Sequence, residues 1–128
     1  MTLGFEIELP QAQDAAIARV EAALKAEGFG ILTRIDVKAT LKEKIDADFR
    51  PYTILGACNP PLAHQALTAE PSIGLLLPCN VVVRQEDNGT VHVEFMDPNA
   101  VLNLVDNPAV QTLANQVRER LDRVLAAL

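Results

Sequence analysis

The chain has 128 residues, of which 49% are hydrophobic and 22% are charged, and these fractions are typical of one soluble globular domain. Its net charge of −6 and sequence pI of about 4.8 repel phosphate backbones and anionic lipid surfaces, so neither nucleic acid nor a membrane is an expected partner. With 4% aromatic residues and no tryptophan, it also offers little for stacking against bases.

The start of the chain, Met1 to Glu6, lacks the basic and apolar segments of a signal peptide. No stretch approaches the roughly twenty apolar residues that span a bilayer, so we expect a cytoplasmic protein. In that reducing compartment the two cysteines are expected to be free thiols. No linker or low-complexity tract divides the chain, which predicts one domain over residues 1–128.

The first part of the chain predicts a strand, a helix and a second strand. Apolar and polar residues alternate over Leu3–Leu9, which is the pattern of a half-buried strand. From about Gln11 the apolar residues recur every three to four positions, as in an amphipathic helix. Gly28 is expected to end this helix in a left-handed conformation, with Phe29 folding back onto its apolar stripe. Alternation resumes over Ile31–Val37 and predicts the second strand.

A short helix is expected next, because Thr40 to Glu43 has the spacing of a capping box. Tyr52–Cys58 predicts a third strand that is apolar on both faces. Three Asx-Pro steps then predict helix starts. In each step the Asn or Asp side chain can cap a helix, and the proline suits the first turn of that helix. These steps are Asn59-Pro60, Asp97-Pro98 and Asn107-Pro108, and they predict helices over about 60–69, just after Pro98, and over about 108–127.

A hairpin is predicted between the first two of these helix starts. Residues 71–74 form a turn or one helical turn, and 75–85 is the most continuously apolar stretch, with Pro78 marking a strand start, a bulge or a free edge. Asp87-Asn88-Gly89 is a hairpin signal, because Asn and Gly tolerate positive φ angles. The strand over 90–95 therefore pairs back on its predecessor. Five strands with helices on one face predict a single α+β domain with a mainly antiparallel sheet.

Two Cys-Asn steps are the most distinctive feature for function. Cys58-Asn59 and Cys79-Asn80 each lie where a predicted strand meets a turn or a proline. Neighbouring strands could bring these four residues together with His64, and a small molecule could bind there. Alternatively, Cys58 and Cys79 with His64 could form a thiol-redox or Zn²⁺ site, or one thiolate could attack a substrate with His64 as its base.

The spacing of these residues does not favour the thiol or metal alternatives. The chain has no C-x-x-C motif, and His64 falls on the polar side of its predicted helix, as His92 does on its strand. Buried cysteines commonly act as small packing residues, and Asn59 already has a capping role. The residues therefore identify no metal site, cofactor or catalytic residue, and they leave open whether the protein is an enzyme.

Four segments carry a resemblance to a known family: residues 28–37, 55–63, 74–83 and 96–98, with both Cys-Asn steps inside them. They resemble the bacterial and archaeal family called domain of unknown function 302 over nearly the whole chain. The resemblance implies a β-α-β(4)-α arrangement similar to the TATA-box-binding-protein-like fold, often paired as a dimer. It supplies no established activity.

A homodimer is also expected from the predicted sheet itself. Helices on one face leave the other face uncovered, and the third and fourth strands are apolar on both faces. Such strands call for more burial than one helical layer provides. We therefore expect two copies of the chain to associate.

Overall fold

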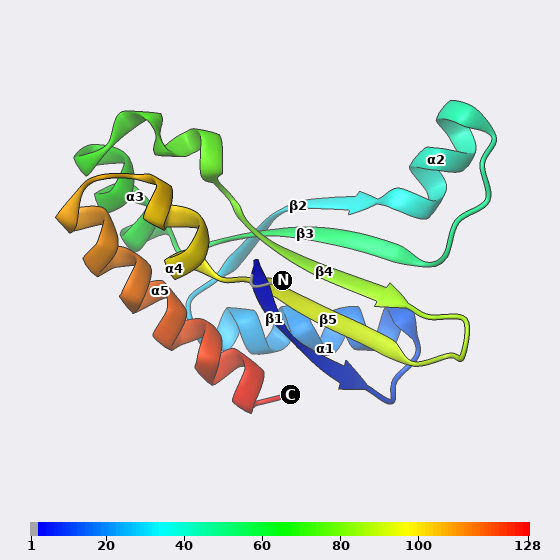
Figure 1. Cartoon of the computed structure of the whole chain (residues 1–128). Helices are drawn as coiled ribbons and strands as arrows, with labels where there is room; N and C mark the ends of the chain where they lie inside the picture. The colour runs from blue at the N-terminus through cyan, green and yellow to red at the C-terminus, as the bar shows by residue number, and fades with distance from the viewer. Residues whose placement is uncertain (1–2) are drawn as a thin grey trace.

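A five-stranded antiparallel sheet forms the centre of the computed structural model, which describes residues 3–128 (Figure 1). Its order across the sheet is β1-β5-β4-β3-β2, and every neighbouring pair is antiparallel. The edges are therefore β1 and β2. The strands are β1 (Gly4–Leu9), β2 (Gly30–Asp36), β3 (Tyr52–Cys58), β4 (Cys79–Gln85) and β5 (Val91–Met96).

The helices confirm the predicted α+β class. They are α1 (Gln13–Ala26), α2 (Val37–Ile45), α3 (Pro60–Ala69), α4 (Pro98–Val101) and α5 (Pro108–Ala126), with 3-10 segments η1 (Pro71–Leu76) and η2 (Leu102–Leu104). In Figure 1, α1 runs along the sheet, α3 and α4 gather with α5 at one end, and α2 projects from the opposite end. No helix among residues 3–128 is long and apolar enough to cross a membrane.

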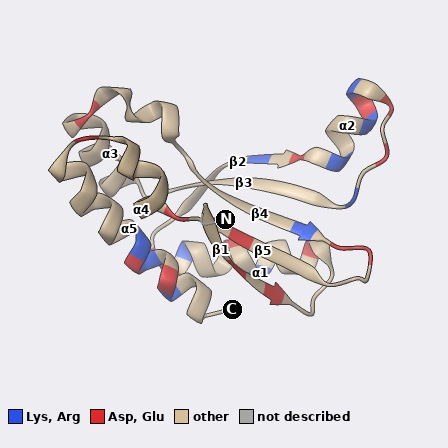
Figure 2. Ribbon diagram, viewed as in Figure 1, with Lys and Arg blue, Asp and Glu red and all other residues tan. Residues whose placement is uncertain are grey.

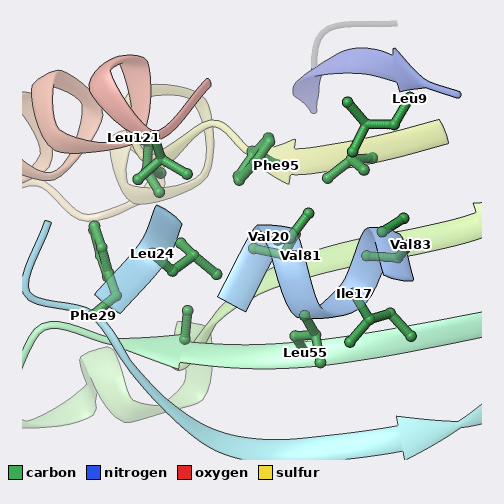
Figure 3. Packing of buried hydrophobic residues seen from close by; sticks show 14 of the residues in the cluster. Leu9, Ile17, Val20, Leu24, Phe29, Leu55, Val81, Val83, Phe95 and Leu121 are labelled. Carbon is green, nitrogen blue, oxygen red and sulfur yellow. The ribbon is translucent and has the colours of Figure 1, made fainter. Parts of the chain in front are cut away.

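The main hydrophobic core lies between α1 and the sheet, and the last turns of α5 close it (Figure 3). Its largest fully buried side chains include Phe95, Ile17 and Leu24. β1, β3, β4 and β5 contribute alternate residues to this face, as the period of two predicts, whereas β2 contributes only the partly buried Ile31. The labelled members in Figure 3 are Leu9, Ile17, Val20, Leu24, Phe29, Leu55, Val81, Val83, Phe95 and Leu121.

A second, smaller cluster lies beyond the end of the sheet, where α3, η1, η2 and α5 meet. Its buried members are Leu62, Ala66, Ile73, Leu102, Val110, Leu113 and Ala114. Val117 packs against both clusters, so it is a point of contact between them. The interior is thus divided into two parts that meet near the middle of α5.

The end of α1 follows the prediction closely. Gly28 has φ of +86°, a conformation that glycine adopts without steric cost. The amide of Gly28 donates to the carbonyl of Lys25, and the amide of Phe29 donates to the carbonyl of Leu24. This is the Schellman pattern, and it returns Phe29 to the core, where 2% of its surface is exposed.

All three predicted Asx-Pro helix starts are confirmed. Each capping oxygen accepts a backbone N–H in the first turn of its helix, as expected for an N-cap. The Oδ1 atoms of Asn59, Asp97 and Asn107 accept from the amides of Leu62, Asn99 and Ala109 at 3.3, 2.9 and 3.0 Å.

Around β2 and α2 the sequence prediction was wrong in two details. The pairing register of β2 shifts between Ile31 and Thr33, so the predicted alternation does not run through the strand. The helix also begins before Thr40, because Asp36 ends β2 and caps α2 by accepting from the amide of Ala39 at 2.9 Å. The Thr40 hydroxyl instead donates to the carbonyl of Asp36.

The fourth strand is shorter than the apolar stretch that predicted it. Residues 75 and 76 belong to η1, and β4 begins at Cys79, directly after Pro78. Apolar character alone does not distinguish a strand from a 3-10 segment, and Leu75 is in fact 89% exposed, whereas the proline marks the boundary.

The face of the sheet turned away from α1 is here called the open face. Its residues are exposed or half-buried, apart from Gly56, which lies close to Pro78. His92 lies on this face, but its side chain is only 16% exposed, so the predicted solvated position is wrong in degree. From the pairing register, the open face comprises Gly4, Glu6, Glu8, His92, Glu94, Met96, Asn80, Val82, Arg84, Tyr52, Ile54, Gly56, Thr33 and Ile35.

Candidate functional site

A cavity of about 290 Å³ lies where the two hydrophobic clusters meet. The ends of β3 and β4 form one wall, and α3, η1 and α5 form the others. Its lining consists of Phe29, Leu32, Ala57, Cys58, Asn59, Leu62, Ala63, Ala66, Leu67, Ile73, Gly74, Leu77, Pro78, Cys79, Leu102, Val110, Leu113 and Val117. No lining residue carries a charge, and Asn59 is the only one with an oxygen or nitrogen in its side chain.

The way into this cavity is marked by exposed leucines. Leu32, from the irregular part of β2, is 64% exposed, and Leu67 of α3 is 41% exposed, although both line the cavity. Other lining residues, such as Ile73 at 1%, are buried. The cavity therefore meets solvent between β2 and α3.

Asn59 supplies the only polar side-chain group of the lining, and it is 7% exposed. Its Oδ1 is used in capping α3. Its Nδ2 donates no hydrogen bond to any group within residues 3–128. Gly28 leaves space for this amide, because a Cβ at Gly28 would lie 3.1 Å from Nδ2. The amide nitrogen therefore lies beside Gly28, which is not part of the lining, and the Asn59 side chain serves mainly as the N-cap of α3.

Both cysteines line the cavity and neither forms a disulfide. Cys79 pairs across the sheet with Ala57, the residue before Cys58. Burial, followed by the proximity of Cys58, raises the pKa of the Cys79 thiol from its ordinary value of 9.0 to about 11. Burial also raises the pKa of the Cys58 thiol. Both groups are therefore neutral thiols near pH 7, which suits an apolar wall better than a nucleophile or a metal ligand.

The structure brings three of the five predicted site residues together. Cys58, Asn59 and Cys79 line the same cavity. Asn80 is exposed on the open face, because it follows Cys79 by one position in a strand. His64 is exposed on α3 and does not line the cavity. No group of three or more His, Cys, Asp or Glu residues in the range 3–128 is arranged to hold a metal ion.

Most residues of the cavity wall were not predicted from the sequence. Val110, Leu113 and Val117 of α5 fall on the apolar stripe that predicts a helix facing the core. A stripe of that kind does not reveal whether it faces a packed interior or a void. The only sequence signal for this wall was the proximity of the Cys-Asn steps to strand ends.

Comparison with known proteins gives a family but no activity. The family model described as domain of unknown function DUF302 matches residues 5–128. Among solved structures, the chain is similar to an uncharacterized conserved DUF302 protein from Bacillus stearothermophilus, known from its crystal structure. The identity is 32%, the TM-score is 0.90, and 99% of this chain and 98% of the other are covered. No curated protein matches the chain.

Proposed function

Because the chain belongs to the DUF302 family, which brings no activity with it, we propose its function from the cavity: the domain binds a small, uncharged, mainly apolar molecule. The observation that carries this proposal is the lining, in which Asn59 is the only side chain with an oxygen or nitrogen. Burying a charge in such surroundings without a partner is strongly unfavourable. Binding pockets for small molecules commonly combine apolar walls with very few polar groups.

The size of the cavity limits the ligand. An apolar cavity of about 150 Å³ holds benzene, so 290 Å³ corresponds to about a dozen non-hydrogen atoms. At about 0.5–0.7 kcal/mol per atom, such a ligand would bind with a Kd of about 1–50 µM. Asn59 would be the one amide side chain at the wall beside such a ligand.

A series of eight-carbon probes tests this proposal. 1-Octanol should bind the protein, whereas octanoate and octylammonium should bind at least about 30-fold more weakly, because their charges lose water without gaining a partner. Ala66→Phe should abolish octanol binding, since Ala66 is 6% exposed and its side chain lines the cavity. Calorimetric titration gives the affinities.

The control for this experiment is Ala18→Phe, which adds the same ring at an exposed position on α1. Circular dichroism and thermal melting check that each variant folds. Where Ala66→Phe does not fold, Ala63→Phe fills the same wall from a half-buried position. Equal binding of octanol and octanoate, or octanol binding unchanged in the folded filled variant, would contradict the proposal.

We also infer that the protein is a homodimer in the cytoplasm. The half-buried apolar residues of the open face, Ile54 and Val82, support association, because one layer of helices leaves them in contact with water. The two free cysteines are consistent with a reducing compartment. The thiol-redox or metal alternative with His64 has less support, because burial keeps both thiols protonated.

Sedimentation equilibrium of the full chain measures the association. The expected mass is twice the 13.9 kDa of one chain. Dilution should lower the measured mass toward that of a single chain. Ile54→Lys should shift the equilibrium toward the single chain, because it places a charge in the expected contact. A single-chain mass at every concentration tested would contradict the homodimer.

A further inference from the structure

Within residues 3–128, the helix α2 packs only loosely, against the ends of β2 and β3. None of its residues is buried, and it projects from the sheet at the end of β2 (Figure 1). Ile45 is 69% exposed, and Phe49, just beyond the helix, is 41% exposed. Leu41 and Ile45 lie four positions apart and so share one face of the helix. Most helices of folded domains gain their stability from burying such a face, whereas here Leu41 is only half-buried and Ile45 is exposed.

Two lysines of α2 also lack partners. Lys42 forms ion pairs with Asp46 and Asp48, at 2.9 and 3.3 Å. Lys38 and Lys44 are exposed and form no ion pair with any residue in the described range 3–128. In a chain with a net charge of −6, two lysines without ion pairs in the described range, beside a partly exposed apolar stripe, are a distinctive surface.

The opposite half of the open face has the complementary charge. Glu6, Glu8 and Glu94 project from β1 and β5, and red marks these strands in Figure 2. Arg84 pairs with Glu94 and lies 3.8 Å from Glu6. Among the residues from 3 to 128, the ion-pair partner of the Glu8 carboxylate is the His92 ring alone, at 3.6 Å, and the Glu8 side chain is 64% exposed. At the β1 edge of the sheet, the three carboxylates therefore outnumber the basic side chains that pair with them.

The topology places these two surfaces at the same end of the sheet. β2 ends at Asp36 and β1 ends at Leu9, and the register of the intervening antiparallel strands brings both ends level with the β4–β5 hairpin. When two open faces stack about a two-fold axis parallel to β4, the β2 edge of one copy lies over the β1 edge of the other. This operation brings α2 beside the carboxylates of Glu6 and Glu8.

The sheet alone provides a small contact. Five strands about 4.8 Å apart and about 20 Å long cover about 500 Å², whereas a stable interface buries about 800 Å² on each partner. An additional element from each copy is therefore needed, and α2, which has no buried residue, projects at this end of the sheet.

We propose that α2 is an arm that clasps a second copy of the chain, with Lys38 and Lys44 beside Glu6 and Glu8 of the partner subunit. This inference rests on the homodimer in the proposed function and adds which surfaces form it. The arrangement is isologous, because the same contact occurs twice about the two-fold axis. It buries the Leu41–Ile45 stripe of each helix.

Charge reversal tests the pairing directly. Lys38→Glu with Lys44→Glu should raise the dimer dissociation constant at least about tenfold, because like charges then face each other at two symmetric sites. Glu6→Lys with Glu8→Lys should have a similar effect. The chain with all four substitutions should return to within about threefold of the original constant. Sedimentation equilibrium measures all four proteins, and Lys25→Glu on α1 is the control.

The outcomes separate this inference from the homodimer itself. A dimer that withstands both reversals would overturn the role of α2 while leaving the homodimer in place. Failure of the fourfold variant to regain association, although circular dichroism shows it folded, would overturn the specific pairing of lysines with glutamates. A single-chain mass for the unmodified protein would overturn both. Octanol binding should be unchanged in every variant, because none of these residues lines the cavity.

Discussion

Replacing Gly56 with alanine should lower the free energy of unfolding by about 2–3 kcal/mol, which corresponds to a fall in Tm of roughly 10 °C. Gly56 lies in β3 between β2 and β4 on the open face. A Cβ there would lie 2.1 Å from the Thr33 Oγ1 and 2.8 Å from the Pro78 Cγ. Neither separation is possible for real atoms, so strands or side chains must move. Urea unfolding of both proteins measures the difference.

Gly30→Ala is the matched control, since Gly30 also lies in a strand and its added Cβ would meet only the Cys58 carbonyl oxygen, at 4.0 Å. Gly30→Ala should change the free energy of unfolding by less than about 0.5 kcal/mol. Thr33→Ala combined with Gly56→Ala should recover part of the loss, because the closest clashing atom is removed. A Gly56→Ala protein as stable as the original would show that this close packing is absent.

Raising the pH from 9 to 11 should cost the fold about 2 kcal/mol through Cys79 alone. Its thiol has a pKa of about 11 in the folded chain and an ordinary value of 9.0 when exposed. Between these values the folded state holds more protons than the unfolded state, so stability falls as the pH rises. The contribution is fully present below pH 9. Urea unfolding across this range gives the slope.

Other groups also titrate above pH 9, so Cys79→Ala is measured in parallel. The difference in slope between the two proteins isolates the thiol, whatever the substitution costs at neutral pH. Cys58→Ala provides a comparison, because the pKa of Cys58 is also raised by burial but that thiol is less buried. Parallel pH profiles for the original chain and Cys79→Ala would show that the Cys79 thiol is not desolvated.

The parts of the fold that follow from local rules were predictable. Asn59, Asp97 and Asn107 begin helices because an Asx oxygen and a following proline satisfy the first turn without help from distant residues. Gly28 ends α1 for an equally local reason. These features, with the alternating strands, were enough for the α+β class.

The start of α2 shows where local rules fail. Asp36 and Thr40 both suit an N-cap, and the sequence gives no way to choose between them. The choice follows from the pairing of β2 with β3, which ends at Asp36 and leaves that residue free to cap the helix. The irregular register at Leu32 has the same origin, because pairing between distant strands sets it.

The candidate site was predictable only in part. Cys58, Asn59 and Cys79 stood out because they are unusual residues at strand ends, and they do line one cavity. His64 is close to Asn59 in the sequence, but the periodicity of α3 turns it outward. The cavity itself depends on how far α3 and α5 stand from the strand ends. That distance is a property of packing between remote segments, which no single stretch of sequence records.

The division of the interior into two clusters that meet at Val117 has a consequence for kinetics. In the binding proposed above, a molecule would enter and leave between β2 and α3, and movement of the smaller cluster would widen this path while the sheet and α1 stay folded. Partial opening of a small unit requires less free energy than global unfolding, so exchange can be fast in a stable protein. Residence time and global stability are then separate properties, each set by its own cluster.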